Sequence, residues 1–213
     1  MRFRQLLPLF GALFALYIIW GSTYFVIRIG VESWPPLMMA GVRFLAAGIL
    51  LLASLLLRGH KLPPLRPLLN AALIGLLLLA VGNGMVTGAI EMLAAGVVLM
   101  IASMIAGEKL TALPSLSGFL AVGYLALFGS IIAINAYMYL IRNVSPALAT
   151  SYAYVNPVVA VLLGTGLGGE TLSKIEWLAL GVIVFAVVLV TLGKYLFPAK
   201  PVVAPVIQDA SSE

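Results

Sequence analysis

Three polar side chains that lie deep inside long apolar segments, Arg43, Glu91 and Asn156, are the residues of this sequence best suited to chemistry. A guanidinium can hold an anion, a carboxylate can take up a cation or a proton, and an amide can donate and accept hydrogen bonds. Such groups are costly in an apolar medium unless they are paired or hydrated, so they mark a functional site by default. We expect them to line a path for a polar solute, with Asn156 as the first choice, Glu91 as the second and Arg43 as the third. The alternative for Arg43 is structural pairing with a helix end or with carbonyl groups.

Other polar and aromatic side chains accompany these three. Asn83, Thr87 and Glu91 follow one another at i, i+4 and i+8, so a continuous helix would align them on one face as a proton- or cation-coupled path. The patch from Trp20 to Tyr24 is either a solute-facing wall or a helix-packing surface. The tyrosine and asparagine tips further along the chain either recognise polar or aromatic solutes or bond across helices. The pathway candidates are Trp20, Tyr24, Arg43, Asn83, Glu91, Asn135, Tyr154, Asn156 and Pro157.

Proline and glycine positions add predictions about helix geometry and packing. Pro157 removes a backbone hydrogen bond next to Asn156 and predicts a discontinuous helix, a usual device at solute sites in membranes. Residues 164–169 spell the GxGxxG pattern of dinucleotide sites, but no strand precedes them, so we reject that reading. Two pairs, Gly84 with Gly88 and Gly164 with Gly168, are typical of close helix packing. They suggest a homodimer as a hypothesis.

Several classes of function are disfavoured. The chain has no cysteine, and His60 is its one histidine, in a basic loop without a second kind of metal ligand nearby. We therefore expect no metal site and no cofactor. No Ser/His/Asp set or carboxylate pair occurs at plausible spacing, so we do not expect an enzyme. The net charge is +5, but the basic residues are scattered singly between apolar blocks, and this pattern argues against nucleic acid as a partner.

The elements that must position the polar side chains are apolar. The chain is 63% hydrophobic and 9% charged, with a mean hydropathy of +1.17, whereas soluble domains carry about a quarter charged residues. The predicted fold class is therefore all-α, a polytopic membrane helix bundle, with the phospholipid bilayer as its surroundings. The first apolar block is longer than the core of a signal peptide, so we expect it to be retained. The predicted spans are residues 6–30, 36–57, 67–106, 114–140, 146–167 and 175–196.

The third block is too long for one crossing. A helix over residues 67–106 would be about 60 Å long, twice the thickness of a bilayer core of about 30 Å. With a cytoplasmic N-terminus, one crossing there gives six in all and leaves most lysines and arginines on the cytoplasmic side. A hairpin bent at residues 82–84 gives seven crossings and a weaker charge bias. Charge favours six crossings and bilayer thickness favours seven, so both stay open.

Several motifs stand at characteristic places in the predicted spans. They are Ser145-Pro146-Ala147, the YVNPVVA run of residues 154–160, the turn Gly169-Glu170-Thr171-Leu172, Trp177 with Gly181, the WGSTY run of residues 20–24, and Arg43-Phe44. In this combination they resemble the drug/metabolite transporters of the EamA type, and the resemblance covers nearly all of residues 1–197. It implies ten helices in two inverted repeats of five.

Against that plan the chain is an incomplete version of the ten-helix transporter. Residues 1–87 correspond to a truncated first repeat of three spans, residues 88–197 to a second repeat without its first helix, and residues 198–213 to a disordered tail. The resemblance implies a permease or exporter of small metabolites or drugs in the bacterial inner membrane. The alternative is a transport-inactive membrane protein that at most associates with other membrane helices, because alternating access needs two repeats around a shared site.

Overall fold

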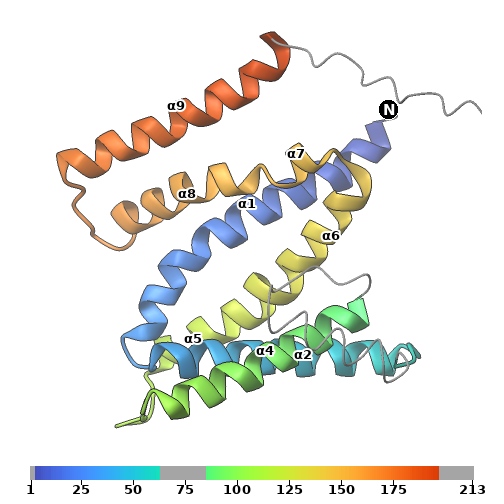
Figure 1. Cartoon of the computed structure of the whole chain (residues 1–213), viewed down its shortest axis with the longest axis vertical. Coiled ribbons are helices and arrows are strands. Elements are labelled where there is room, and N and C mark those ends of the chain that lie inside the picture. Colours follow the sequence, from blue (N-terminus) through green and yellow to red (C-terminus); the bar gives the residue numbers. More distant parts are fainter. Residues whose placement is uncertain (1–2, 63–84, 197–213) are drawn as a thin grey trace, which may run out of the picture. The chain divides into compact units, whose positions relative to one another are not determined.

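The computed structural model describes residues 3–62 and 85–196, and every regular element in this part of the chain is a helix (Figure 1). The chain divides into two compact units, Met1–Thr171 and Leu172–Glu213. The first unit holds α1 (Phe3–Val31), α2 (Pro36–Leu57), α4 (Met85–Ile105), α5 (Leu116–Tyr124), the π-helical segment η1 (Leu125–Ile132), α6 (Ala133–Asn143), α7 (Pro146–Ala149) and α8 (Tyr152–Gly166). The second holds α9 (Lys174–Leu196).

The predicted membrane helix bundle is confirmed. Four helices of the described part are long and apolar enough to cross a bilayer: Leu7–Val31, Pro36–Leu57, Met85–Ile105 and Leu116–Asn143. Tyr152–Gly166 is apolar but shorter. The predicted stretch 67–106 is described only from Met85 onward. Asn83, Gly84 and the predicted tail 198–213 lie outside the described residues, so the number of crossings and the disorder of the tail stay predictions.

The predicted span 146–167 is interrupted. α7 ends at Ala149, a turn at Thr150 and Ser151 follows, and α8 begins at Tyr152. At this turn the Tyr17 hydroxyl of α1 lies 2.6 Å from the Ser151 hydroxyl. The discontinuity therefore lies ahead of Pro157, which stands inside α8.

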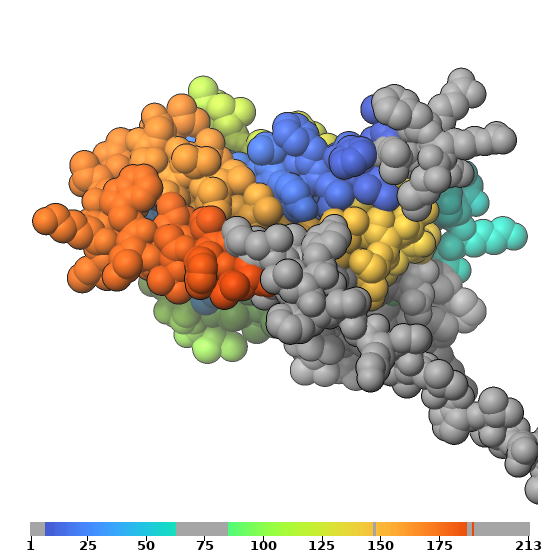
Figure 2. All heavy atoms as spheres, turned by 90° about the horizontal axis from the view of Figure 1, so that it is seen from above, coloured from blue at the N-terminus to red at the C-terminus, as the bar shows by residue number. Residues whose placement is uncertain are grey.

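α1 is the central helix of the first unit and packs against α6 and α8. In Figure 2 its blue spheres lie beside the yellow and light-orange spheres of the segment from α6 to α8. Gly21 lies so close to α8 that a Cβ atom there would stand 2.6 Å from the Cβ of Val159. Leu13 and Leu16 of α1 are buried in one cluster with Leu140 of α6. Small and apolar residues thus let α6 and α8 pack closely against α1.

α2 and α4 are two copies of one structural unit. The sequence Leu-Ala-Ala-Gly occurs at residues 45–48 and again, 48 positions later, at residues 93–96. Each helix ends at a glycine with positive φ, 82° at Gly59 and 72° at Gly107. The N–H of Gly59 donates to the Leu56 carbonyl at 2.9 Å, and the N–H of Gly107 donates to the Met104 carbonyl at 3.1 Å. Both ends are therefore the same glycine-terminated helix cap.

The two copies pack against each other antiparallel and with reciprocal contacts. A Cβ atom on Gly48 would lie 2.7 Å from Leu93 Cγ, and a Cβ atom on Gly96 would lie 2.7 Å from Leu45 Cγ. Leu45 corresponds to Leu93 and Gly48 to Gly96, so each copy offers the other the same surface. Such self-complementary contact is the property of a two-fold axis. α2 and α4 are thus related by a local pseudo-two-fold axis.

Glu108 links the C-terminal end of α4 to the N-terminus of α2 through hydrogen bonds. α2 begins after Pro35, which provides no side-chain cap for the free N–H groups of the first turn. Glu108, directly after α4, accepts hydrogen bonds from the N–H of Leu37 at 3.0 Å and of Met38 at 2.8 Å. The Ser103 hydroxyl donates a third bond, at 2.8 Å. A carboxylate is favoured at a helix N-terminus, where unpaired N–H groups carry partial positive charge.

The second unit begins with its own cap. The N–H and the hydroxyl of Ser173 both donate to the Glu176 carboxylate at 2.7 Å, and the N–H of Glu176 donates to the Ser173 oxygen at 3.3 Å. This reciprocal pattern is a capping box, and it sets the start of α9.

Gly96→Ala should destabilise the protein, because the new Cβ atom would lie 2.8 Å from the backbone nitrogen of Leu45. Overpacking of this kind costs about 1–3 kcal/mol. Gly88→Ala on the same helix is the matched control, since a Cβ atom there meets nothing within 4 Å. Thermal unfolding of both purified variants in one detergent measures the effect. Equal unfolding temperatures would contradict the close packing of α2 and α4.

The contribution of Glu108 should depend on pH. Burial opposes ionisation of its carboxyl group, but hydrogen bonds from Leu37, Ser103 and Met38 outweigh it and lower the pKa of Glu108. A group with a lowered folded-state pKa adds stability above its unfolded pKa, and this is lost as the pH falls through the folded pKa. The stability difference between the wild type and Glu108→Gln should therefore shrink from about pH 7 to about pH 3. Thermal unfolding tests this, and a constant difference would contradict the cap.

Candidate functional site

The π-helical segment η1 joins three spans through polar contacts. A π-helix has hydrogen bonds from residue i to residue i+5, and such segments are frequent at functional sites. The Trp20 indole N–H of α1 donates to the carbonyl of Gly129 at 3.0 Å. The Ser130 hydroxyl donates to the Leu125 carbonyl at 3.1 Å and accepts a bond from Arg43 Nε at 3.1 Å. We call Trp20, Arg43, Gly129 and Ser130 the η1 node.

Arg43 brings a positive charge into the η1 node from α2. Its guanidinium carbon lies 5.0 Å from the centre of the Phe44 ring, close enough for an attractive contact between the cation and the ring. Nη2 lies 3.3 Å from the position that a Cβ atom on Gly129 would take. Within the described ranges the hydrogen bond of Arg43 goes to the neutral Ser130, and no carboxylate forms an ion pair with it. The cation is thus held in place without a neutralising side chain from this part of the chain.

Two tyrosine rings contact Trp20. Its ring centre lies 4.5 Å from that of Tyr152 in α8 and 5.6 Å from that of Tyr137 in α6. The two tyrosine rings stand edge to face, with centres 5.6 Å apart. All three rings are partly buried. Aromatic faces of this kind bind apolar and aromatic groups, and the tyrosine hydroxyls add polar ends. We call Trp20, Tyr137 and Tyr152 the aromatic cluster.

Asn156 lies on the face of α8 that packs against α1. Tyr152, Asn156 and Val159 are spaced i, i+4 and i+7, so they share one face, and both flanking residues contact α1. Asn156 is 7% exposed, and its Oδ1 atom has no hydrogen-bond partner among the described residues. A buried amide oxygen without a partner is costly. Asn156 therefore presents a buried hydrogen-bond acceptor on the α1-facing side of α8 that no described donor occupies.

Glu91 lies apart from the η1 node. It is 7% exposed in α4. Gly41, Leu45 and Gly48 of α2 face α4, so Arg43 projects from the opposite face of α2, toward η1. Glu91 is the pseudo-two-fold counterpart of Arg43 and projects from the face of α4 opposite α2. The structure therefore does not bring these two predicted pathway residues together.

The remaining candidates are divided between internal contacts and exposed positions. The Asn135 amide donates to the carbonyl of Ile131 at 2.8 Å, where η1 passes into α6. Tyr24 is 61% exposed and Tyr154 is 43% exposed. Thr87 is partly buried in α4.

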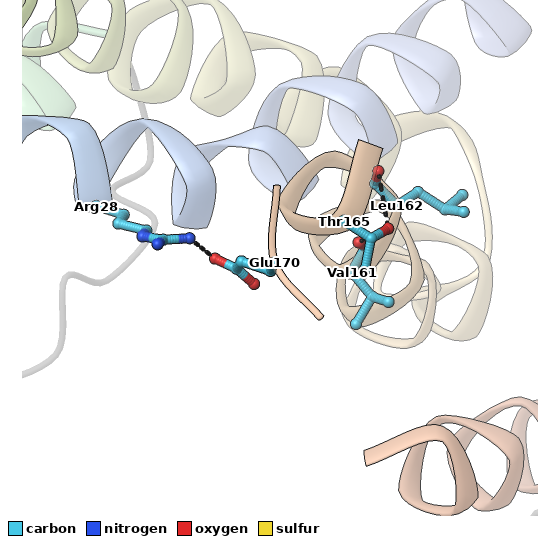
Figure 3. A network of polar contacts seen from close by, with 5 residues as sticks. All are labelled: Arg28, Val161, Leu162, Thr165 and Glu170. Atoms are coloured by element: carbon cyan, nitrogen blue, oxygen red, sulfur yellow. Dashed lines mark hydrogen bonds and ion pairs between the residues drawn. The ribbon is translucent and has the colours of Figure 1, made fainter. Parts of the chain in front are cut away.

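The predicted packing glycines that the structure describes, Gly88, Gly164 and Gly168, have surroundings that differ from one another. Gly164 and Gly168 close a turn in their own chain: a Cβ atom on Gly164 would lie 2.6 Å from Glu170 Oε2, and one on Gly168 would lie 2.6 Å from the Gly164 carbonyl. Glu170 forms an ion pair with Arg28 of α1 (Figure 3). In the last turn of α8, the Thr165 hydroxyl donates a hydrogen bond to the carbonyl of Val161 at 2.8 Å (Figure 3). A Cβ atom on Gly88 would meet no atom of the described residues within 4 Å.

An apolar groove of about 730 Å³ lies next to the η1 node. It runs between α1 and the segment from α5 to η1, and its lining includes Val26, Ile29, Tyr124 and Phe128. The rings of Tyr124 and Phe128 are stacked, with centres 5.0 Å apart. The Tyr124 hydroxyl lies 2.7 Å from the Ser22 hydroxyl, two residues beyond Trp20.

Sequence reasoning did not identify Gly129 and Ser130. The pair is a small-residue step within an otherwise apolar run, which is a weak signal by itself. Their role depends on the π-helical register of η1 and on the position of Arg43 across the helix interface. Neither can be derived from spacing along one helix.

The sequence of this chain is similar to one protein family and to several known proteins. Residues 9–91 and 84–192 both match the model of the EamA-like transporter family. The uncharacterized inner membrane transporter YedA of Escherichia coli strain K12 is 69% identical over an alignment of 306 positions, which covers 100% of this chain and 100% of that protein. The YedA proteins of strain CFT073 (O6:H1) and of E. coli O157:H7 match to the same extent. No solved structure matches the chain significantly.

The alignment also reveals a difference in length. This chain has 213 residues, whereas YedA has 306. The identity nevertheless extends over the whole chain, and the two family matches together span residues 9–192. The resemblance drawn from the sequence motifs is confirmed: the chain belongs to the EamA-like transporter family.

Proposed function

We propose that this chain is a permease that moves small organic solutes, metabolites or drugs, across the bacterial inner membrane. Membership of a transporter family and similarity to an inner membrane transporter support this function. The observation that carries it is the unpartnered Asn156 oxygen on α8, beside the aromatic cluster and close to the η1 node. A polar group of this kind in a membrane helix is retained for a polar partner that is not part of the helix itself.

The residues have separate roles in this proposal. Asn156 accepts a hydrogen bond from the solute, the aromatic cluster contacts its apolar part, and Arg43 supplies positive charge. Glu91, on the other side of the α2–α4 pair, serves as a separate proton or cation site. The turn between α7 and α8 gives the solute site a discontinuous helix, as many transporters have. No metal ion, cofactor or catalytic step is part of this proposal.

We further propose that the N-terminus is cytoplasmic and that the chain crosses the membrane six times. The antiparallel packing of α2 and α4 supports this, because the end of α2 at Leu57 and the start of α4 at Met85 then lie at the same end of the pair. The basic residues Arg2, Arg4, Arg58 and Lys61 would then be cytoplasmic, as the positive-inside rule favours. Arg28 and Glu170 would lie near the opposite surface.

The two family matches support a chain of two incomplete repeats. They overlap at residues 84–91, where we place the boundary between repeat segments 1–87 and 88–197. The length of 213 residues against 306 in YedA supports the absence of helices between them. The pseudo-two-fold relation of α2 and α4 agrees with corresponding helices of inverted repeats. A homodimer is a further proposal, and Gly88, where a Cβ atom would meet no atom of the described residues within 4 Å, is the glycine best placed for it.

Asn156→Ala should lower transport about tenfold, since loss of one hydrogen bond to the solute is worth roughly 1–2 kcal/mol. The measurement is efflux of a panel of labelled amino acids and drugs from cells with and without the chain. The matched control is Asn143→Ala, whose amide is exposed and bonds to the Tyr139 carbonyl of its own helix at 2.7 Å.

Equal efflux from cells with and without the wild-type chain would refute transport and favour the rival function, a transport-inactive membrane protein. Equal efflux by Asn156→Ala and the wild type would leave transport intact and remove Asn156 from the pathway.

Reporter fusions test the orientation. A periplasmic reporter fused after Gly107 and a cytoplasmic reporter fused after Arg142 should both be active, because α4 runs outward and the span from α5 to α6 runs inward in the six-crossing arrangement. The same reporters exchanged between the two sites are the control. Activity of the exchanged pair alone would support seven crossings instead.

A further inference from the structure

We propose that the solute carried by this chain is an organic anion, whose carboxylate is bound by Arg43 and whose aromatic or apolar body lies against the aromatic cluster. This inference rests on the proposed transport function and specifies its substrate class.

Arg43 is incompletely paired within the described residues. A guanidinium has five N–H donors in one plane. In the described residues, Nε donates to Ser130 Oγ at 3.1 Å, and this is the hydrogen bond that Arg43 makes. A structural arginine inside a membrane span is expected to have a carboxylate or several carbonyl partners. The two terminal nitrogens of Arg43 are therefore available to a ligand, and their fork geometry matches a carboxylate.

Gly129 allows the guanidinium of Arg43 to approach the η1 backbone closely. Nη2 lies 3.3 Å from the position of a Cβ atom on Gly129, and Thr23 Cγ2 lies 3.2 Å from it. Any larger residue would press against the guanidinium. Ser130, in turn, fixes the guanidinium through Nε, because its own hydroxyl is anchored on the Leu125 carbonyl. The site thus holds the cation in one orientation, with Nη2 against Gly129 and Nε on Ser130.

Apolar and aromatic side chains lie next to the η1 node. Trp20 donates to the carbonyl of the same Gly129 and contacts Tyr152 and Tyr137. Asn156 follows Tyr152 by one helical turn, and its buried oxygen can take an N–H or O–H donor of the solute. The apolar groove between Val26 and Phe128 provides an approach for an amphiphilic molecule. A small anion without an apolar or aromatic group would make no contact with these surfaces.

Binding of three related probes tests the proposal. Indole-3-acetate, indole-3-acetamide and tryptamine carry the same ring with negative, zero and positive charge. Binding to the full chain in lipid nanodiscs is measured by equilibrium dialysis with labelled probe. The acid should bind at least about tenfold more tightly than the amide or the amine. Arg43→Gln should abolish this preference, and Arg43→Lys should retain part of it, because the charge stays but the fork is lost.

Arg28→Gln is the matched control, since Arg28 is half exposed and paired with Glu170, and it should keep the wild-type preference. Arg43→Gln should lower the unfolding temperature only slightly, as expected from the loss of one hydrogen bond. If Arg43 had a purely structural role, the same substitution would lower the unfolding temperature strongly.

Equal binding of acid and amide, an unchanged preference in Arg43→Gln, or no binding of the acid would each overturn the anion site. These results are distinct from failure of the proposed function. If the chain produces efflux but binds acid and amide equally, the transport function stands and the anion site is refuted. If the chain binds the acid selectively but produces no efflux, the anion site stands and the transport function is refuted.

Discussion

A polar group within a bilayer must find its partner inside the protein or in a bound solute, because lipid offers none. This constraint explains the arrangement around η1. Three backbone carbonyls of η1 accept hydrogen bonds from the side chains of Trp20, Ser130 and Asn135. Arg43 and Asn156 are two side chains for which the described residues supply fewer partners than their chemistry allows. Both lie close to residues that contact α1.

The position of Arg43 depends on the packing of α2 against α4. Gly48 and Gly96 let the two helices approach so closely that the Leu45 and Leu93 side chains lie over the opposing glycines. Without hydrophobic driving force in lipid, such close packing is a main source of helix association. Glu108 adds a fixed end to the pair. With one face of α2 committed to α4, Arg43 is directed toward η1.

The sequence was sufficient to predict the fold class and most span limits, because apolar runs of spanning length have few alternatives. It also identified Trp20, Arg43 and Asn156, since polar and aromatic groups in apolar runs are conspicuous. It could not predict that Arg43 and Glu91 project from opposite sides of a helix pair, because that depends on which helices meet. The π-helical register of η1 and the turn ahead of Tyr152 were also out of reach, since no residue type specifies them. Whether the chosen residues bind a solute stays a prediction.

Disulfide formation in native membranes tests the central claim, the antiparallel α2–α4 pair that orients Arg43, most directly. The chain has no cysteine of its own, so a Leu45→Cys/Gly96→Cys variant carries no background thiols. A Cβ atom on Gly96 would lie 2.7 Å from Leu45 Cγ, which is close enough for a disulfide once a small helix shift relieves the contact with the Leu45 backbone nitrogen. The account predicts rapid intramolecular disulfide formation with a mild oxidant, and none for Leu45→Cys/Gly88→Cys, whose residues lie two helical turns out of register. Equal cross-linking of both pairs, or cross-linking of the second alone, would contradict it.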